Sequence, residues 1–276
     1  MVVMITGLIR DGEGKLEAEI ARLRRAFEPL GALRFFVVES DSRDATPQIL
    51  RDLARNHRDF SFQSLGELEK QIPDRTPRLA YCRNLAWEVV AQEVADHRCD
   101  LVVVADLDGV NKRLHWRSVM SSFNRSQEWS ALFANQPDAY DDIYALRHPL
   151  WSPNDFKKQE RELQGVLDAE LANQVATGGR IIGIPQNHRP IEVDSAFGGL
   201  GIYRGPAFVS ARYSGRLPNG ELVCEHVPFH LEMRSQGHRL FISPSLVNCY
   251  SRVDSRGFRY RLQLSRAHRS LGWTRK

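Results

Sequence analysis

The sharpest chemical pattern in the sequence is a pair of aspartates that directly follows its most apolar run. The segment from Asp100 to Asn111 reads D-L-V-V-V-A-D-L-D-G-V-N, so Asp106 and Asp108 emerge at the end of an expected buried strand. Two close carboxylates repel each other unless a cation lies near them. Mg²⁺ and Mn²⁺ take oxygen ligands and keep positions open for phosphate oxygens. We therefore predict a metal site that neutralises a diphosphate; the alternative is a strand-end turn, where Asp and Gly are common.

A carboxylate and a guanidinium upstream of these aspartates could contact other parts of a nucleotide. Glu39 follows the apolar run 33–38 and opens the polar cluster E-S-D-S. A carboxylate at such a strand end commonly accepts hydrogen bonds from a base or a ribose hydroxyl, although a loop that caps the next helix would look similar. Arg83 lies in an expected helix, and its guanidinium matches phosphate geometry; the alternative is a solvated helix face.

Two downstream segments add glycines, a glutamate and histidines. Gly198 and Gly199 lie in F-G-G-L-G-I-Y-R and would let the backbone approach a ligand, although a bent strand would also use them. Glu225 opens an expected helix and could act as a general base or orient an acceptor hydroxyl. His226 and His230 share a face of that helix and could bind a metal, but two histidines without a third ligand more often bond to protein partners.

The elements expected around these residues alternate between strand and helix in the first half of the chain. Apolar runs predict strands at 2–9, 33–38, 60–65 and 100–105, and helical periodicity begins at 16, 46 and 77. This alternation indicates a parallel sheet whose ligands bind beyond the carboxyl ends of its strands. The second half is less regular: strands are expected at 129–134, 143–146 and 239–242, and helices at 154–175, 205–212 and 224–236.

The composition is that of an ordinary globular protein, with 276 residues, 42% hydrophobic and 26% charged residues, and a formal net charge of +4. Eight Arg or Lys residues lie at 252–276, which predicts phosphate attraction and a peripheral membrane contact, with a solvated terminus as the alternative. The four cysteines show neither close pairs nor zinc spacing, so we expect reduced thiols. Residues 2–9 are too short for a signal peptide, and no run reaches transmembrane length, so we expect a cytoplasmic protein.

In their order along the chain, these segments resemble the markers of GT-A glycosyltransferases. The matching segments are Glu39 as the nucleotide-contacting acid, Arg83-Asn84 as the pair before the aspartate strand, Asp106-Leu107-Asp108 as the DxD motif, Phe197-Gly198-Gly199-Leu200 as the glycine-rich loop, and Cys224-Glu225-His226 as the acidic motif. The resemblance spans residues 2–248. It implies a mixed α/β sheet flanked by helices, with a GT-A domain at 1–250 (nucleotide-binding half 1–111, acceptor half 112–250) and a basic extension at 251–276.

A finer resemblance involves two short segments. E-H-V-P-F-H from Glu225, followed by F-I-S-P-S-L from Phe241, is similar to the fungal capsule-associated α-1,3-mannosyltransferases. That family implies GDP-mannose as donor, a Mn²⁺-type metal and retention of the anomeric configuration. Many GT-A enzymes also have a histidine metal ligand after the last strand, where this chain has Asn248. The resemblance then requires Asn248 or a histidine such as His226 to replace it, or a weaker metal site.

Together these residues predict a metal-dependent glycosyltransferase. Asp106 would contact the ribose and the metal, Asp108 would bind Mn²⁺ or Mg²⁺, and His226 would be a further ligand. Arg83, Glu39, Gly198 and Gly199 would contact the nucleotide-sugar donor. Glu225 would serve as the base toward a glycan or glycolipid acceptor if the reaction inverts; if it retains, the leaving phosphate would take the proton.

Two other functions fit parts of the sequence. A sugar-1-phosphate nucleotidyltransferase would share the nucleotide-binding half, but its N-terminal glycine-rich loop with Arg and Lys is missing. A nucleic-acid-binding protein could use the basic end of the chain. Phe258 and Tyr260 lie between neighbouring arginines there, but the aromatic residues do not form a clear stacking platform, so no nucleic-acid partner is expected.

Overall fold

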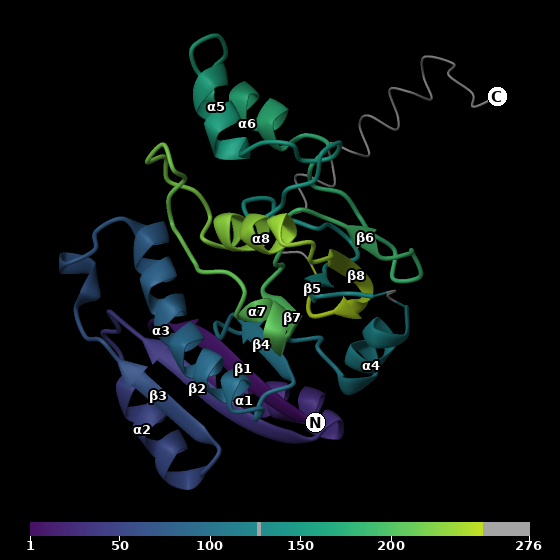
Figure 1. Cartoon of the computed structure of the whole chain (residues 1–276). Helices are drawn as coiled ribbons and strands as arrows, with labels where there is room; N and C mark the ends of the chain where they lie inside the picture. The colour runs from purple at the N-terminus through teal and green to yellow at the C-terminus, as the bar shows by residue number, and fades with distance from the viewer. Residues whose placement is uncertain (126–127, 251–276) are drawn as a thin grey trace.

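The computed structural model describes residues 1–125 and 128–250, and within these residues eight strands form one sheet (Figure 1). The strands are β1 (Val2–Ile9), β2 (Ala32–Glu39), β3 (Phe60–Ser64), β4 (Leu101–Ala105), β5 (Ala131–Asn135), β6 (Ile191–Glu192), β7 (Leu200–Arg204) and β8 (Leu240–Val247). The helices are α1 (Leu16–Phe27), α2 (Thr46–Asn56), α3 (Arg75–Ala95), α4 (Trp116–Arg125), α5 (Phe156–Leu163), α6 (Ala169–Thr177), α7 (Gly205–Phe208) and α8 (His226–Ser235), with short 3₁₀ turns at Glu28–Leu30 and Leu68–Lys70.

The sheet has the order β3-β2-β1-β4-β7-β5-β8-β6 and is mixed, as the sequence predicted. Strands β1 to β4 pair in parallel because helices connect them, so their carboxyl ends meet at one edge. Strand β7 lies antiparallel between β4 and β5, and β8 pairs in parallel with β5. The segment after β4 therefore lies beside the segment that precedes β7, although about ninety residues separate them in the sequence.

Alternate residues of the central strands enter two cores on opposite faces of the sheet. One core contains Val3 and Ile5 with side chains of α1, α2 and α4. The other contains Met4 and Val102 with side chains of α3, α7 and α8. Because both faces are covered by helices, the central strands are apolar on both sides, which explains the continuous apolar runs in the sequence.

The structure departs from the sequence predictions most clearly at residues 143–146 and 154–175. Residues 143–146 form turns and not a strand; Ile143 and Leu146 are buried, so packing rather than strand pairing explains their apolar character. The single helix predicted at 154–175 is two helices. The carboxylate of Asp155 accepts hydrogen bonds at the start of α5, and that of Asp168 does so at the start of α6, so the chain begins a new helix at each aspartate.

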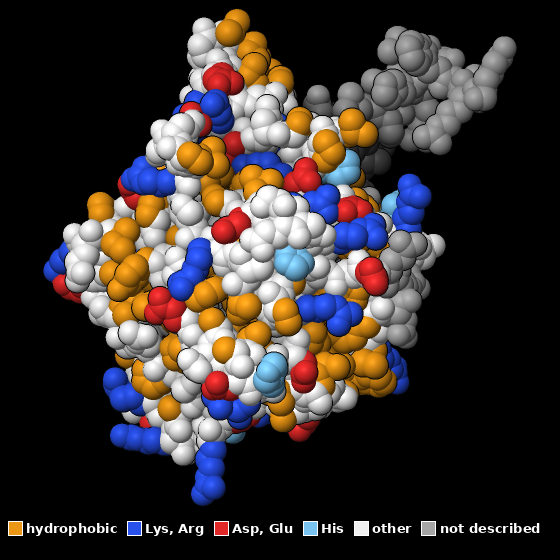
Figure 2. Space-filling view, viewed as in Figure 1, with side chains coloured by type: hydrophobic (Ala, Val, Ile, Leu, Met, Phe, Trp, Pro, Cys, Tyr) orange, Lys and Arg blue, Asp and Glu red, His pale blue; other side chains and the backbone are white. Residues whose placement is uncertain are grey.

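Helices α5 and α6 pack against each other and project from the body of the molecule (Figure 1). Figure 2 shows hydrophobic side chains on this projection, where Val166, Leu171 and Val175 are exposed, while charged residues of both signs alternate over the rest of this face. Among the described residues, no helix is both long and apolar enough to span a bilayer. The basic segment 251–276 lies outside the described residues.

Candidate active site

A cavity with a volume of about 520 Å³ lies beyond the carboxyl ends of the parallel strands. One side, which we call the strand wall, consists of residues that end β1, β2 and β4 together with Arg83 of α3. The opposite side, the loop wall, consists of residues from 141–145, 197–199 and 224–226. A cavity of this size at the strand ends of an α/β sheet is typical of a small-molecule site.

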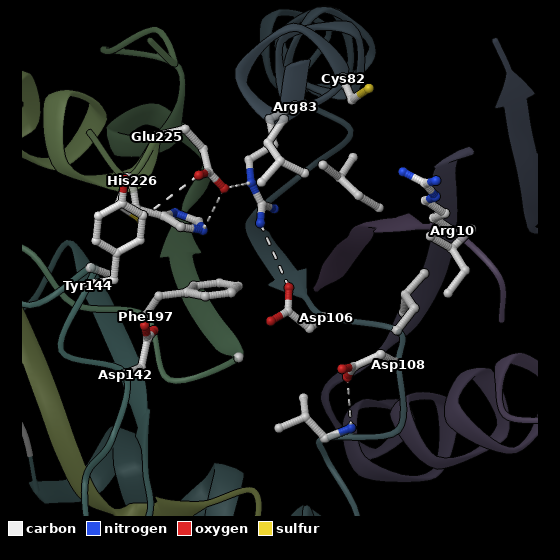
Figure 3. Close-up of a pocket in the computed structure, with 18 of the residues that line it drawn as sticks. Arg10, Cys82, Arg83, Asp106, Asp108, Asp142, Tyr144, Phe197, Glu225 and His226 are labelled. Atoms are coloured by element: carbon white, nitrogen blue, oxygen red, sulfur yellow. Dashed lines mark hydrogen bonds and ion pairs between the residues drawn. The ribbon is translucent and has the colours of Figure 1, made fainter. Parts of the chain in front are cut away.

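Asp106 and Asp108 directly follow β4 and line the strand wall (Figure 3). The backbone N–H of Asp106 donates to the carbonyl oxygen of Gly199 at 2.9 Å, which joins the two walls at the bottom of the cavity. The carboxylate of Asp108 accepts the backbone N–H of Val110 at 3.2 Å. The two acids predicted as a pair therefore lie in a structured turn that opens into the cavity.

Electrostatics at this turn favour a bound cation. Desolvation in the cavity raises the pKa of Asp106 to about 7; Arg83 opposes this shift, and the acids Asp108, Asp142 and Glu225 add to it. The side chain of Asp106 is nevertheless 46% exposed, because it faces the open cavity rather than the protein core. Because the acids around Asp106 outnumber the nearby cations, ionising its carboxyl group costs free energy. A bound metal ion would offset this cost.

Arg83 forms a buried ion pair with Glu225 between α3 and the start of α8. Its Nε atom lies 2.8 Å from Oε1 of Glu225, and a second guanidinium nitrogen lies 3.7 Å from the carboxylate of Asp106. The guanidinium also lies over the rings of Phe197 and Tyr213, at 5.3 and 5.8 Å from their centroids. Burial by itself would lower the pKa of Arg83, but the pairing with Glu225 raises it above its ordinary value. Arg83 is thus a fixed cation at the bottom of the cavity.

Glu225 lines the cavity, but its carboxylate is paired with Arg83. Its side chain is 4% exposed and neutralises Arg83. A general base must be free to reach the proton that it removes, and the carboxylate of Glu225 is held by the buried guanidinium of Arg83. The geometry therefore places Glu225 as the partner of Arg83.

A buried amide network braces the turn that follows the aspartates. Asn248 donates to the side-chain oxygen of Asn111 at 3.0 Å and to the carbonyl oxygen of Gly198 at 2.8 Å. It accepts the amide of Gln136 at 2.9 Å, and Asn111 donates to the carbonyl oxygen of Asp106 at 2.9 Å. Asn248 is fully buried. The residue at the position of the expected histidine ligand is therefore a structural brace and not a metal ligand.

Gly198 and Gly199 lie where the loop wall passes close to the aspartate turn, and their backbone geometry requires glycine. Their φ angles are +68° and +82°, in the left-handed region that side chains disfavour. A Cβ atom on Gly198 would lie 2.8 Å from the carbonyl oxygen of Ala134, and one on Gly199 would lie 2.9 Å from Val110. The glycines thus let the loop pass close to the turn of the aspartates while both line the cavity.

Glu39 does not line the cavity, in contrast to its prediction as a donor contact. It is buried, and its carboxylate accepts the backbone N–H of Ser42 at 3.0 Å and the hydroxyl of Ser64. The acid of this cluster that lines the cavity is Asp41, whose φ of +63° turns it away from the direction of β2. The sequence does not distinguish the two acids, because the turn that directs Asp41 into the cavity depends on its left-handed backbone conformation.

The two histidines of α8 do not form a metal pair. His230 is bonded on both ring nitrogens, to Ser195 at 3.0 Å and Tyr203 at 2.9 Å, and burial lowers its pKa to about 3. The ring of His226 stacks on Phe197 at 3.9 Å, and burial together with nearby Arg83 lowers its pKa far below the ordinary value.

In the part of the chain that the structure describes, no three His, Cys, Asp or Glu side chains are grouped to hold a metal ion. The predicted set of Asp106, Asp108 and His226 is therefore not assembled. The physical reason is that His226 is directed into the aromatic packing beside Glu225, on the wall opposite Asp108 (Figure 3). Any metal ion here would be coordinated by Asp106 and Asp108 together with atoms of a bound small molecule.

Two acids that sequence analysis missed also shape the site. Asp142 lines the loop wall, and its carboxylate accepts the backbone N–H of Gly198 at 2.8 Å. Glu19 of α1 is fully buried beneath the aspartate turn and accepts the backbone N–H of Asn111 at 3.3 Å. Neither acid has a clear sequence signal, because Asp142 lies in an irregular segment and Glu19 looks like any charged residue of an amphipathic helix.

Comparisons with known proteins identify the fold. No protein-family model matches the chain, and no curated protein sequence matches it. Among solved structures it is similar to the mannosyltransferase PcManGT from Pyrobaculum calidifontis in complex with GDP-Man and Mn²⁺, at 15% identity over 94% of this chain and 59% of that chain, with a TM-score of 0.50. It is also similar to S. aureus TarS 1-349 in complex with UDP, at 14% identity over 96% of this chain and 64% of that chain, with a TM-score of 0.53.

The chain spans less than two thirds of the length of these structures. At such low identity the likeness concerns the arrangement of elements and not the individual residues. It agrees with the mixed sheet, the helices on both faces and the cavity at the strand ends. The chain has the GT-A fold of glycosyltransferases.

Proposed function

We propose that this protein is a glycosyltransferase that moves a sugar from a nucleotide-sugar donor to a hydroxyl acceptor. The observation that carries this proposal is the place of Asp106 and Asp108: they open into the main cavity at the strand ends of a GT-A fold. Fixed charges around a cavity can stabilise a diphosphate as it leaves, without reorganisation at the moment of reaction.

The aspartate turn fits a divalent metal that is shared with the donor. Asp106 and Asp108 offer oxygen ligands, and no third protein ligand is grouped with them among the described residues. Mg²⁺ and Mn²⁺ suit such a site because they are often bound by one or two carboxylates together with phosphate oxygens. The ion, when bound, would neutralise charge on the diphosphate. PcManGT, which has the same fold, was solved with GDP-Man and Mn²⁺.

The remaining residues of the strand wall suit the rest of the donor. Arg83 offers guanidinium donors beside Asp106, where they could bind the diphosphate. Ser40 and Asp41 line the cavity at the end of β2 and could accept or donate hydrogen bonds to the nucleoside. Gly198 and Gly199 leave space for the sugar close to the backbone.

The donor is proposed to be GDP-mannose, and the product a glycan or polysaccharide. This finer assignment is supported by the E-H-V-P-F-H and F-I-S-P-S-L segments, which resemble fungal capsule-associated mannosyltransferases, and by the GDP-Man complex of PcManGT. TarS, of similar fold, was solved with UDP and with UDP-GlcNAc, so UDP-linked sugars are the natural competing donors in a test.

A thermal-shift panel of GDP-, UDP-, CMP- and dTDP-linked sugars, each with and without Mn²⁺, tests the proposal. A ligand present at 100 times its Kd stabilises the folded state by about 2.7 kcal/mol. For a chain of this size that corresponds to a rise in Tm of roughly 5–10 °C. We expect such a rise only with nucleotide and Mn²⁺ together, and the largest rise with GDP-mannose. A panel without any nucleotide-dependent shift would contradict the proposed function.

A further inference from the structure

The loop wall presents a carboxylate whose position the sequence did not predict. Asp142 lies in the segment that follows β5, between the buried residues Tyr140 and Ile143. Tyr140 pairs with Ile182 through a backbone bridge, so the segment is anchored although it is irregular. The backbone N–H of Gly198 donates to Oδ2 of Asp142 at 2.8 Å and fixes the side chain in the cavity wall.

Asp142 differs from Glu225 in its charge environment. Arg83 neutralises Glu225 at 2.8 Å. By contrast, no Lys or Arg among residues 1–125 and 128–250 forms an ion pair with Asp142. Only backbone N–H groups, those of Gly198 and Ala145, favour its charged form. Asp142 is thus a cavity carboxylate whose negative charge is not cancelled by a protein cation.

The surroundings of Asp142 also make its carboxylate more basic. Desolvation raises its pKa above the ordinary value, and the neighbouring acids Asp141 and Glu225 raise it further, against the backbone hydrogen bonds. General bases work best when their pKa approaches the working pH. The shift therefore agrees with the geometry, which already places Asp142 at the cavity surface.

Figure 3 shows Asp142 on the same side of the cavity as Tyr144, Phe197 and His226, with Asp106 and Asp108 on the other side. A donor whose diphosphate lies at the two aspartates would present its sugar toward the loop wall. The hydroxyl that attacks this sugar would then reach it from the side of Asp142.

We propose that Asp142 binds the attacking hydroxyl of the acceptor and takes its proton, while Glu225 acts as a positioning residue that holds Arg83. This inference rests on the proposed glycosyltransferase function. The acceptor oxygen forms a bond to the anomeric carbon, and the bond from that carbon to the diphosphate oxygen breaks. The electron pair leaves with the diphosphate, and the hydroxyl proton passes to the Asp142 carboxylate. Because the base and the leaving group lie on opposite sides, the anomeric configuration inverts, in contrast to the retention that the resemblance to the fungal mannosyltransferases implies.

The test compares Asp142→Asn with the matched control Asp138→Asn, which removes a carboxylate from an exposed position of the same segment outside the cavity wall. Each variant is given GDP-mannose or UDP-GlcNAc with Mn²⁺, and release of nucleoside diphosphate is measured with water and with a panel of methyl glycosides as acceptors. Nucleotide binding is measured separately by thermal shift. Asp142→Asn should bind the nucleotides as the wild type does but turn over about 100-fold or more slowly, within the usual range for loss of a general base.

A conservative variant distinguishes a catalytic role of Asp142 from a purely structural one. Asp142→Glu keeps a carboxylate and should recover part of the lost turnover, with a shifted acid limb in the pH profile of kcat. The same recovery is not expected if Asp142 only supports the Gly198 backbone. Saturation-transfer NMR with methyl glycosides on nucleotide-loaded protein gives a readout independent of turnover, and Asp142→Asn should weaken that signal.

Three results would overturn the inference: near-wild-type turnover of Asp142→Asn, retention of configuration in the product, or a wild-type protein that binds donor but neither turns it over nor binds the methyl glycosides. Absence of nucleotide binding by the wild type would instead contradict the proposed function. The two failures are therefore distinguishable.

Discussion

The two walls of the cavity are built in different ways. On the strand wall, Asp106 and Asp108 follow a buried parallel strand, and Arg83 projects from the long helix that precedes it. On the loop wall, Asp142 and Glu225 come from segments outside the sheet, more than eighty residues apart in the sequence. The strand wall holds the Arg83 cation between its own Asp106 and Glu225 of the loop wall, whereas the loop wall combines carboxylates with aromatic rings.

This difference suggests a division of tasks. A wall with fixed charges at strand ends suits a charged diphosphate, which needs the same contacts whatever sugar it carries. A wall of loops and rings suits a sugar and a hydroxyl, whose apolar ring faces and hydrogen-bonding groups vary among substrates. Variants on each wall should therefore fail in different ways.

The largest expected effect is that of Asp108→Ala on the strand wall. Loss of a metal ligand should lower turnover by about 1,000-fold or more, since removal of one preorganised charge contact already costs 10²–10³ in kcat. Folding should change little, because Asp108 lies in a turn that opens into the cavity. The measurement is nucleoside diphosphate release with Mn²⁺, beside the Mn²⁺-dependent thermal shift. Full activity of this variant would refute the assigned role of Asp108.

The connection between the walls is tested by Arg83→Met. Removing one partner of a buried ion pair leaves Glu225 charged and unpaired, which typically costs about 3–5 kcal/mol in the free energy of unfolding. Urea denaturation of Arg83→Met should show this loss, and the double variant Arg83→Met, Glu225→Gln should recover most of it. If the single and double variants were equally unstable, the pairing would not explain the burial of Arg83.

The buried amide network around Asn248 should contribute to the stability of the fold and not to metal affinity. Asn248→Ala leaves the buried side-chain oxygen of Asn111 without its donor, whereas Gln136 and Gly198 keep the hydrogen bond between them, and one such unpaired group costs about 1–3 kcal/mol. Asn248→His places the residue that the resemblance expects there, yet it should also destabilise the fold without tightening Mn²⁺ binding. Isothermal calorimetry with Mn²⁺ and GDP measures the affinity, and tighter binding by Asn248→His would mean that this position can reach the metal.

The smallest expected effect is a pH dependence of metal binding. The pKa of Asp106 is raised to about 7 without metal, so its carboxylate is largely protonated below that pH. A metal needs the ionised form, so Mn²⁺ affinity should rise with pH through about 7 and fall up to tenfold per unit below it. The sign is opposite for the metal-free fold, since a raised carboxyl pKa contributes stability at low pH that is lost as pH rises through about 7. Mn²⁺ titrations at pH 6 and 8 check this, with Asp106→Asn as the variant that should lose the dependence.

Prediction from the sequence succeeded where the signal comes from neighbouring residues and was poorer where it depends on distant ones. Helical and apolar periodicity gave the parallel half of the sheet, and the aspartate pair was found because it directly follows a strand. In the E-S-D-S cluster, local signals favoured Glu39, although Asp41 is the acid that lines the cavity. The sequence pattern also suggested His226 as a metal ligand, because the pattern does not reveal that its ring stacks on Phe197.

The sequence by itself determined the alternation of strands and helices, the acids that end β4 and the glycines that a close backbone approach requires. These features depend on neighbouring residues, so periodicity and turn chemistry are sufficient to find them. Only the tertiary structure decided that Arg83 neutralises Glu225, that Asn248 braces the aspartate turn and that Asp142 faces the cavity without an ion-pair partner among the described residues. Such partnerships join residues far apart in the chain, and burial and charge act on a side chain only after packing has chosen its neighbours.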